Sequence, residues 1–323
     1  MPLTDLPLEQ LRDFRPEVAE PADFDRFWED TLAESRASGG AIERRAALTP
    51  IRELIVEDLT FPGFGGEAIR AWITRPQREG RLPVVVEYIG YNGGRGVAGE
   101  KLQWAAAGYV HVLMDTRGQG SGWGTGGDTP DPHGSEASVP GFMTRGISDP
   151  ATYYYRRVFT DGVRLIDAVR ELPFVDAGRI AVTGSSQGGG IALAVGGLVH
   201  GLVGVLPDVP FLCHFGRSVQ LTPDQPFMEI ARYLAVHRDQ DERVFRTLSY
   251  FDGVNFARRV AAPALFSVAL MDGIVLPSSV FAAYNHLAVD DREIAVYPFN
   301  GHEGGQTHQW VRQAEWLSAR STP

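Results

Sequence analysis

A serine flanked by glycines, in the run Gly184-Ser185-Ser186-Gln187-Gly188, is the residue of this sequence with the clearest chemical signature. The run lies between a β-branched stretch at 179–183, which predicts a strand, and a helix of small residues at 187–200. A sharp strand-to-helix turn of this kind exposes a serine hydroxyl on a strained backbone, with glycines that keep other side chains away. We therefore expect Ser186 to be a nucleophile; Ser185 is the rival, but the glycine spacing favours Ser186.

A serine hydroxyl is a weak nucleophile without a base, and His302 is the best candidate for that base. It lies in the loop 300–305, directly after a predicted strand at 293–299, with glycines on both sides. Asp272 directly follows another predicted strand, 264–270, so its carboxylate should emerge at the same edge of the sheet. There it would hold His302 in the correct tautomer and stabilise the imidazolium.

Other acids and bases remain as alternatives. Asp208, which follows an earlier strand, is the alternative acid, whereas Asp290 and Asp291 sit at a helix end where water solvates them. His308 falls inside the predicted last helix and is a weaker base, and His133 lies in a polar loop from which it could only contact substrate. The remaining histidines precede or miss the required loop and are expected to be structural: His111, His200, His214, His237 and His286.

The intermediate of an acyl transfer needs two backbone N–H groups to hold its negative oxygen. One should come from Gln187, the residue after the nucleophile. The other should come from the loop 90–94, after a predicted strand at 82–89, and Tyr91 fits by position, although it could instead pack at the mouth of the site. Tyr91 and Trp123 could line a small acyl pocket, and Trp123 is equally compatible with plain packing.

The elements that position these residues alternate along the chain. Near-continuous apolar strands separated by helices are typical of a parallel sheet covered on both faces. The predicted strands of this sheet are 82–89, 109–115, 179–183, 202–206, 264–270 and 293–299. The predicted helices are 21–36, 98–107, 159–172, 187–200 and 307–319, and strands 51–61 and 67–75 are predicted to form a hairpin.

The predicted fold class is therefore α/β, with a mostly parallel sheet flanked by helices. The alternation is interrupted at about 211–260 by a charged, largely helical stretch, which we interpret as an insertion. With a helical N-terminal extension over about 1–40, the whole chain, 1–323, is predicted to be a single domain.

Composition narrows the possible partners and compartments. The 323 residues carry a formal net charge of −10, which argues against nucleic acid and anionic membranes as partners. The one cysteine, Cys213, lies in an apolar run and is predicted to be a buried thiol, so we expect neither an intramolecular disulfide nor a cysteine metal cluster. We find neither a signal peptide nor a membrane span, and expect a cytoplasmic protein that uses no metal and no cofactor.

Three signatures occur in order along the chain: Arg117-Gly118-Gln119, the serine run at 184–188, and His302-Glu303. Together they make the sequence similar to carbohydrate esterase family 7, the acetyl xylan esterases and cephalosporin C deacetylases. Further matching stretches lie at 115–120, 153–157 and 250–256. The resemblance covers nearly the whole chain and is far more specific than the serine motif alone.

The resemblance implies an α/β-hydrolase fold, with Ser186, Asp272 and His302 as the catalytic triad. It also implies that Tyr91 and Gln187 are the oxyanion donors. Family members remove acetyl groups from short acetylated xylo-oligosaccharides, and many also deacetylate cephalosporin C. They form ring-like hexamers whose active sites face an internal cavity, so this chain is expected to be a homo-oligomer that acts on small esters.

By the same resemblance, Arg117, Gln119 and Glu303 would support the site rather than react. A bidentate arginine fork suits this role, because it can hold loop carbonyls or a carboxylate. One departure follows the acid: Leu276 stands where the family pattern leads us to expect a second proline beside Pro277. The departure leaves the triad intact and bears on the stiffness of this loop and on the substrate range.

Two other functions remain as alternatives. One is a different hydrolase on the same fold, such as a peptidase or a lactone hydrolase. The other is a binding protein without catalytic activity, which the complete triad argues against.

Overall fold

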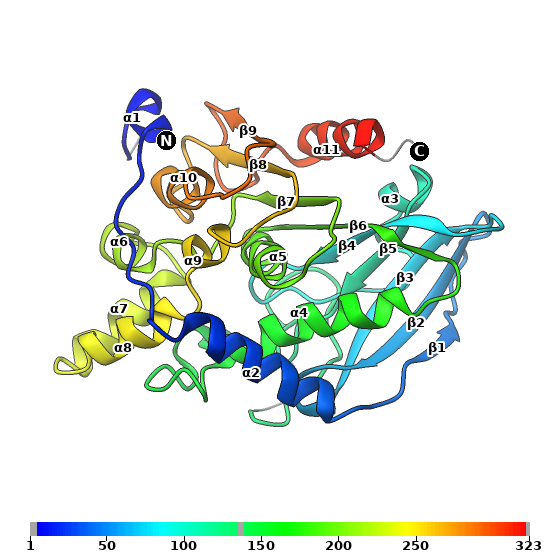
Figure 1. Cartoon of the computed structure of the whole chain (residues 1–323), viewed down its shortest axis with the longest axis horizontal. Helices are drawn as coiled ribbons and strands as arrows, with labels where there is room; N and C mark the ends of the chain where they lie inside the picture. The colour runs from blue at the N-terminus through cyan, green and yellow to red at the C-terminus, as the bar shows by residue number, and fades with distance from the viewer. Residues whose placement is uncertain (1–4, 135–138, 321–323) are drawn as a thin grey trace.

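The computed structural model describes residues 5–134 and 139–320, which contain a nine-stranded sheet with helices on both faces (Figure 1). In spatial order the strands are β1-β2-β3-β5-β4-β6-β7-β8-β9. Their bounds are β1 Glu43–Ala46, β2 Leu54–Pro62, β3 Ala68–Pro76, β4 Leu82–Tyr88, β5 Val110–Met114, β6 Val175–Ser185, β7 Gly204–Asp208, β8 Ala264–Ala269 and β9 Arg292–Tyr297.

The larger part of the sheet is parallel, and the N-terminal strands join it antiparallel. β2 pairs antiparallel with β3 along its whole length, which confirms the predicted hairpin. β3 then pairs antiparallel with β5, and every neighbouring pair from β5 to β9 is parallel. The predicted fold class is therefore confirmed.

Helices lie on both sides of this sheet, and Figure 1 shows α4 and α5 on one side and α11 on the other. The bounds are α1 Leu8–Arg12, α2 Phe24–Ala37, α3 Gln103–Ala106, α4 Tyr154–Arg170, α5 Gln187–Leu198, α6 Phe215–Leu221, α7 Phe227–Val236, α8 Asp241–Ser249, α9 Gly253–Ala257, α10 Pro277–Asn285 and α11 Gln306–Arg320. Within the described residues, none of these helices combines the length and the apolar character that crossing a bilayer requires.

The central strands are buried on both faces, as their runs of branched apolar residues predict. Val84 and Val86 of β4 belong to the core on the side of α4 and α5. Val85 belongs to a second cluster, which includes Trp104 of α3 and Trp316 of α11. Because successive side chains of a strand point to opposite faces, β4 packs against the helices on both sides of the sheet. The carboxyl ends of the central strands therefore lie between the two helical layers.

Some elements differ from the sequence predictions in their bounds. The helix predicted at 98–107 is reduced to α3, because Gly99 adopts a φ of +86° and the residues before Gln103 form turns. α4 begins at Tyr154, and β6 extends beyond its predicted core at both ends. β1 and α10 were not predicted: the four residues of β1 are all exposed and carry no apolar alternation, and α10 begins at Pro277, directly after the loop of the acid.

The stretch predicted as a helical insertion forms α6, α7, α8 and α9 between β7 and β8. α9 packs on α5, the helix that follows the serine run, and α7 packs on the short helical turn Phe142–Thr144. Cys213 lies at the start of this stretch as a free and fully buried thiol, as predicted. The insertion therefore sits over the carboxyl edge of the sheet, beside the nucleophile.

Candidate active site

Ser186 lies at the turn between β6 and α5 on a strained backbone, with φ 57° and ψ −119°. A non-glycine residue in such a conformation costs about 1–3 kcal/mol, which its surroundings must offset. The Ser186 N–H donates to the carbonyl of Asp208 (2.9 Å), and the Ser186 carbonyl accepts the N–H groups of Phe211 (3.0 Å) and Gly190 (3.0 Å). These three bonds hold the strained turn at the carboxyl edge of the sheet.

The flanking glycines are required by close contacts between backbones. A Cβ on Gly188 would lie 2.1 Å from the carbonyl oxygen of Tyr88, at the end of β4. A Cβ on Gly184 would lie 2.4 Å from the carbonyl carbon of Gly188. Larger residues at either position would push α5 away from the sheet and move the Ser186 hydroxyl, which explains the spacing of the motif.

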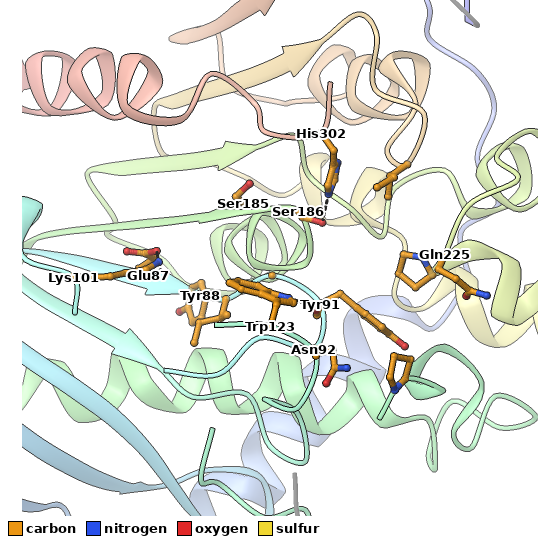
Figure 2. Close-up of a pocket in the computed structure, with 16 residues that line it drawn as sticks. Glu87, Tyr88, Tyr91, Asn92, Lys101, Trp123, Ser185, Ser186, Gln225 and His302 are labelled. Carbon is orange, nitrogen blue, oxygen red and sulfur yellow. Dashed lines mark hydrogen bonds and ion pairs between the residues drawn. The ribbon is translucent and has the colours of Figure 1, made fainter. Parts of the chain in front are cut away.

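The three predicted triad residues lie together. Figure 2 shows the His302 imidazole directed at the Ser186 hydroxyl, with His302 Nε2 and Ser186 Oγ 2.9 Å apart. On the other side of the ring, His302 Nδ1 lies 2.8 Å from Asp272 Oδ2. The Asp272 carboxylate is fully buried, whereas 28% of the His302 side chain is exposed. Of these two residues, only the imidazole is therefore accessible from outside.

Asp272 is held by its own loop. Its Oδ1 accepts the N–H groups of Ile274 (2.9 Å) and Val275 (2.9 Å), which leaves Oδ2 for His302. The unexpected Leu276 is buried and caps α10, and Pro277 occupies the first turn of that helix. The acid loop is thus fixed by backbone hydrogen bonds and one proline, without the second proline.

The alternative acid and nucleophile lie outside this hydrogen-bond chain. Asp208 Oδ2 accepts from Gln313 Nε2 (3.0 Å), and among the described residues no hydrogen bond joins it to His302. Burial raises the pKa of Asp208 to about 7. Ser185 ends β6 with an exposed side chain that makes no hydrogen bond to His302 among the described residues.

The other histidines are engaged elsewhere or exposed. His111 contacts Glu87 (2.9 Å), and His133 contacts Glu67 (2.9 Å), which lies between β2 and β3. The expected contact of His133 with substrate stays a prediction. His308 is exposed on α11.

The two expected oxyanion donors are tied together by one side chain, that of Gln119. Its Oε1 accepts the N–H of Asn92 (2.6 Å), the residue after Tyr91, and its Nε2 contacts Gln187 Oε1 (2.9 Å). Gln187 is braced further by the hydroxyl of Tyr155 (2.9 Å). In the part of the chain that the structure describes, the backbone N–H groups of Tyr91 and Gln187 donate to no other group, as an oxyanion hole requires of its donors.

The Tyr91 side chain connects this loop to the helical insertion. Its hydroxyl lies 2.5 Å from Glu229 Oε1 on α7, and it accepts the N–H of Phe142 (3.0 Å). Glu229 also accepts the N–H groups of Gly141 (3.1 Å) and Met143 (3.0 Å). Burial, together with this contact, raises the pKa of Tyr91 above its ordinary value, and burial also raises the pKa of Glu229.

Arg117 is a fully buried cation that joins three segments. Its Nε and Nη2 bind the two carboxylate oxygens of Asp161 on α4 at 2.6 and 2.8 Å, which is the bidentate fork expected from the sequence. Its Nη1 contacts Glu67, next to β3, and lies 3.4 Å from Asp131. Burial alone would lower the pKa of Arg117, but Asp161 and Glu67 outweigh burial and raise it.

These acidic partners, together with Glu229, were missed by the sequence analysis. Asp161 carried the best available signal, because it is a lone acid on the apolar side of a predicted helix, and such an acid needs a buried partner. Glu303, expected as a supporting residue, is exposed and accepts a hydrogen bond from Asn300 (2.6 Å) within the same loop.

A cavity of about 520 Å³ opens on the triad and holds both Ser186 and His302 in its wall. Trp123 covers one side, with its indole N–H donating to the Tyr91 carbonyl (2.8 Å) and 55% of its surface exposed. Gly93 lies directly beneath this ring, since a Cβ there would be 2.3 Å from it. The described residues contain no group of three or more side chains that could hold a metal ion.

Comparison with known proteins identifies similar sequences among the acetyl esterases. The family profile for acetyl xylan esterase (AXE1) matches residues 1–320. The acetyl esterase Axe7A of Xylanibacter ruminicola is 25% identical over 307 residues, which is 89% of this chain; this chain spans 65% of the length of that relative.

Two solved structures agree with this one over nearly the whole chain. The acetyl xylan esterase from Paenibacillus sp. R4 is 40% identical with a TM-score of 0.90, over 98% of this chain and 100% of that one. Acetyl xylan esterase 1 from a Thermoanaerobacterium species is 33% identical with a TM-score of 0.89, over the same shares of both chains. The acylaminoacyl peptidase of Pyrococcus horikoshii is 16% identical with a TM-score of 0.59, over 84% of this chain and 41% of that one, and shows the fold alone. The predicted α/β-hydrolase fold is thus confirmed.

Proposed function

Because the chain belongs to the acetyl xylan esterase (AXE1) family, we propose that it is a serine acetyl esterase whose triad is Ser186, Asp272 and His302. The observation that carries this proposal is the pair of hydrogen bonds through one imidazole, 2.9 Å to Ser186 Oγ and 2.8 Å to Asp272 Oδ2. A neutral imidazole held in this way can accept the serine proton at Nε2 while its Nδ1–H donates to the carboxylate of Asp272.

The reaction follows from this geometry as an acyl transfer. His302 takes the proton as Ser186 Oγ attacks the acetyl carbonyl, and the N–H groups of Tyr91 and Gln187 bind the resulting oxyanion. The tetrahedral intermediate collapses, and the alcohol leaves with the proton from His302. Water, activated by the same imidazole, then releases acetate from Ser186.

The proposed substrates are small acetylated compounds, such as acetylated xylo-oligosaccharides and cephalosporin C. A cavity of about 520 Å³ suits a small molecule rather than a polymer chain. The relatives named as acetyl esterase and acetyl xylan esterases support an acetyl group as the acyl part.

We also propose a homo-oligomer, with a hexamer as the family resemblance suggests, in the cytoplasm. Light scattering of the purified protein tests the assembly, and a mass of one or two chains would contradict the hexamer. Cell fractionation tests the compartment.

A substrate panel tests the activity. We expect p-nitrophenyl acetate to be hydrolysed with a kcat/KM well above those of the butyrate and octanoate esters, and a peptide p-nitroanilide to be left intact. Covalent labelling by a fluorophosphonate should fall on Ser186, located by mass spectrometry of the labelled peptide. Preferred cleavage of the anilide would instead indicate a peptidase, and a protein that is neither active nor labelled would indicate a binding function.

A further inference from the structure

A second cavity, of about 550 Å³, adjoins the active-site cavity. It is lined by the ends of β6 and β7, through Ser185 and Asp208, and by the start of α11, through Gln306. Glu87, Lys101 and Ser185 line both cavities, so the two spaces share a wall. Figure 2 shows these three residues on one side of the nucleophile, opposite the side occupied by Gln225.

Two tryptophans give the second cavity an aromatic wall. The rings of Trp104 and Trp310 meet with centroids 5.7 Å apart at an angle of 67°. The indole N–H of Trp310 is buried and has no hydrogen-bond partner among the described residues. Because this N–H is closed to solvent, it is not available to a ligand, and the two rings offer a ligand their apolar surface.

The wall that the two cavities share contains an ion pair. Lys101, the one lysine of the chain, pairs with Glu87, which also contacts His111 (2.9 Å). Burial alone would raise the pKa of Glu87, but Lys101 and His111 lower it to about 2. Glu87 is thus ionised throughout the working pH range and pairs with Lys101, and 47% of the lysine side chain remains exposed to offer N–H donors.

The charges of the wall select the kind of ligand. Carboxyl groups line the second cavity at Glu87, Glu100, Asp208 and Glu303, whereas Lys101 is the one lysine or arginine that lines it among the described residues. An anionic ligand would meet more like charges than opposite ones. A neutral ligand rich in hydroxyl groups fits both the aromatic wall and the many donors and acceptors.

We do not expect the second cavity to catalyse a reaction. Ser185 lies at its edge, but within the described residues no hydrogen bond joins Ser185 to the imidazole of His111, which is occupied by Glu87. The described residues also offer no metal site there. The cavity is therefore suited to binding rather than to catalysis.

We propose that the second cavity is a subsite for a neutral sugar unit of the substrate, while the acetylated unit occupies the cavity at Ser186. Lys101 lies where the two units meet and donates to hydroxyl groups of the ligand. This inference rests on the proposed function for its substrate class. It predicts that the enzyme favours an acetylated xylobiose over acetylated xylose, and a neutral over a uronic-acid-bearing disaccharide.

The first test fills the cavity. Gln306→Trp places a ring at its rim from an exposed position, and His308→Trp is the matched control, because His308 is exposed on the same helix and lines neither cavity. We expect wild-type kcat/KM to rise about tenfold from acetylated xylose to acetylated xylobiose, as one added subsite contact allows. Gln306→Trp should remove this rise by lowering kcat/KM for acetylated xylobiose at least tenfold more than that for p-nitrophenyl acetate. His308→Trp should retain it.

The second test measures binding without chemistry. Calorimetry should show unmodified xylobiose bound by the wild-type protein and by His308→Trp, with about tenfold weaker binding by Gln306→Trp, whose added ring occupies the rim of the cavity. No binding of xylobiose by the wild-type protein, or binding by Gln306→Trp as tight as that by the wild-type protein, overturns the subsite. Failure of the proposed function shows separately, as absent hydrolysis of p-nitrophenyl acetate.

Discussion

The hydroxyl of Tyr91 and a carboxylate oxygen of Glu229 lie 2.5 Å apart, which connects an expected oxyanion donor to helix α7 of the insertion. Glu229 binds the backbone of the segment around Phe142 at the same time. Three parts of the chain that are distant in sequence therefore meet at one carboxylate, which holds the hydroxyl of the Tyr91 side chain.

Glu229 is thus expected to be a positioning residue, which acts through Tyr91. We predict that Glu229→Ala lowers kcat about tenfold with a smaller change in KM, since a displaced donor loses part of its transition-state stabilisation. Glu229→Gln should restore part of the rate, because its amide oxygen can replace Oε1 toward the Tyr91 hydroxyl and the Gly141 N–H, whereas its NH2 group cannot accept the Met143 N–H. Glu242→Ala, an exposed acid on α8, is the control. An unchanged kcat in Glu229→Ala would contradict the proposal that Glu229 positions Tyr91.

Gln119 is expected to align the two oxyanion donors through its contacts with Asn92 N–H and Gln187. Gln119→Leu should lower kcat for p-nitrophenyl acetate about 10- to 100-fold, because it leaves both contacts unmade while keeping the volume. Gln77→Leu, at an exposed position, should match the wild-type enzyme. A loss that falls entirely on KM would indicate a role in substrate binding instead.

Arg117 is expected to stabilise the fold. Arg117→Lys should lower the free energy of unfolding by about 2–4 kcal/mol, measured by urea denaturation, because a lysine cannot replace the bidentate contact with buried Asp161. The exposed pair Arg70–Asp128, with 44% and 49% of the side chains exposed, provides the control. Arg70→Lys should change the unfolding free energy by less than about 1 kcal/mol, and an equal effect of both substitutions would contradict the account.

Asp208 is expected to make stability depend on pH. Burial raises its pKa to about 7, so the folded protein binds this proton more tightly than the unfolded chain does. The contribution is fully present below about pH 4 and is lost as the pH rises through about 7.

Between pH 5 and pH 8, the wild-type protein should therefore lose about 3 kcal/mol of unfolding free energy relative to Asp208→Asn, in which the side chain stays neutral. Urea denaturation at both pH values measures the difference. Parallel pH dependence in the two proteins would show that Asp208 does not titrate in this range.

The parts of the site that lie at strand ends could be predicted from the sequence. Ser186, Asp272 and His302 each follow a clear apolar strand, and parallel strands bring their carboxyl ends to one edge. The glycine spacing around Ser186 adds a second signal, because it reflects backbone contacts that no other residue allows.

The supporting contacts could not be predicted in the same way. Glu229 and Tyr91 are 138 residues apart, and Arg117 and Asp161 are 44 apart, so their pairing depends on the packing of helices whose faces the pattern leaves undefined. β1 escaped prediction because its four residues are exposed and show no apolar alternation, and the Arg44–Glu57 ion pair that joins it to β2 leaves no pattern in the sequence.

The rate of Ser186→Ala on p-nitrophenyl acetate tests the central claim most directly, with Ser185→Ala as its neighbour control. We predict that Ser186→Ala lowers kcat by about 10⁶-fold, as loss of the nucleophile does in comparable triads, in a protein that still folds. Ser185→Ala should retain a rate far above that of Ser186→Ala. Near-wild-type activity in Ser186→Ala would contradict the assignment of the nucleophile and the mechanism built on it.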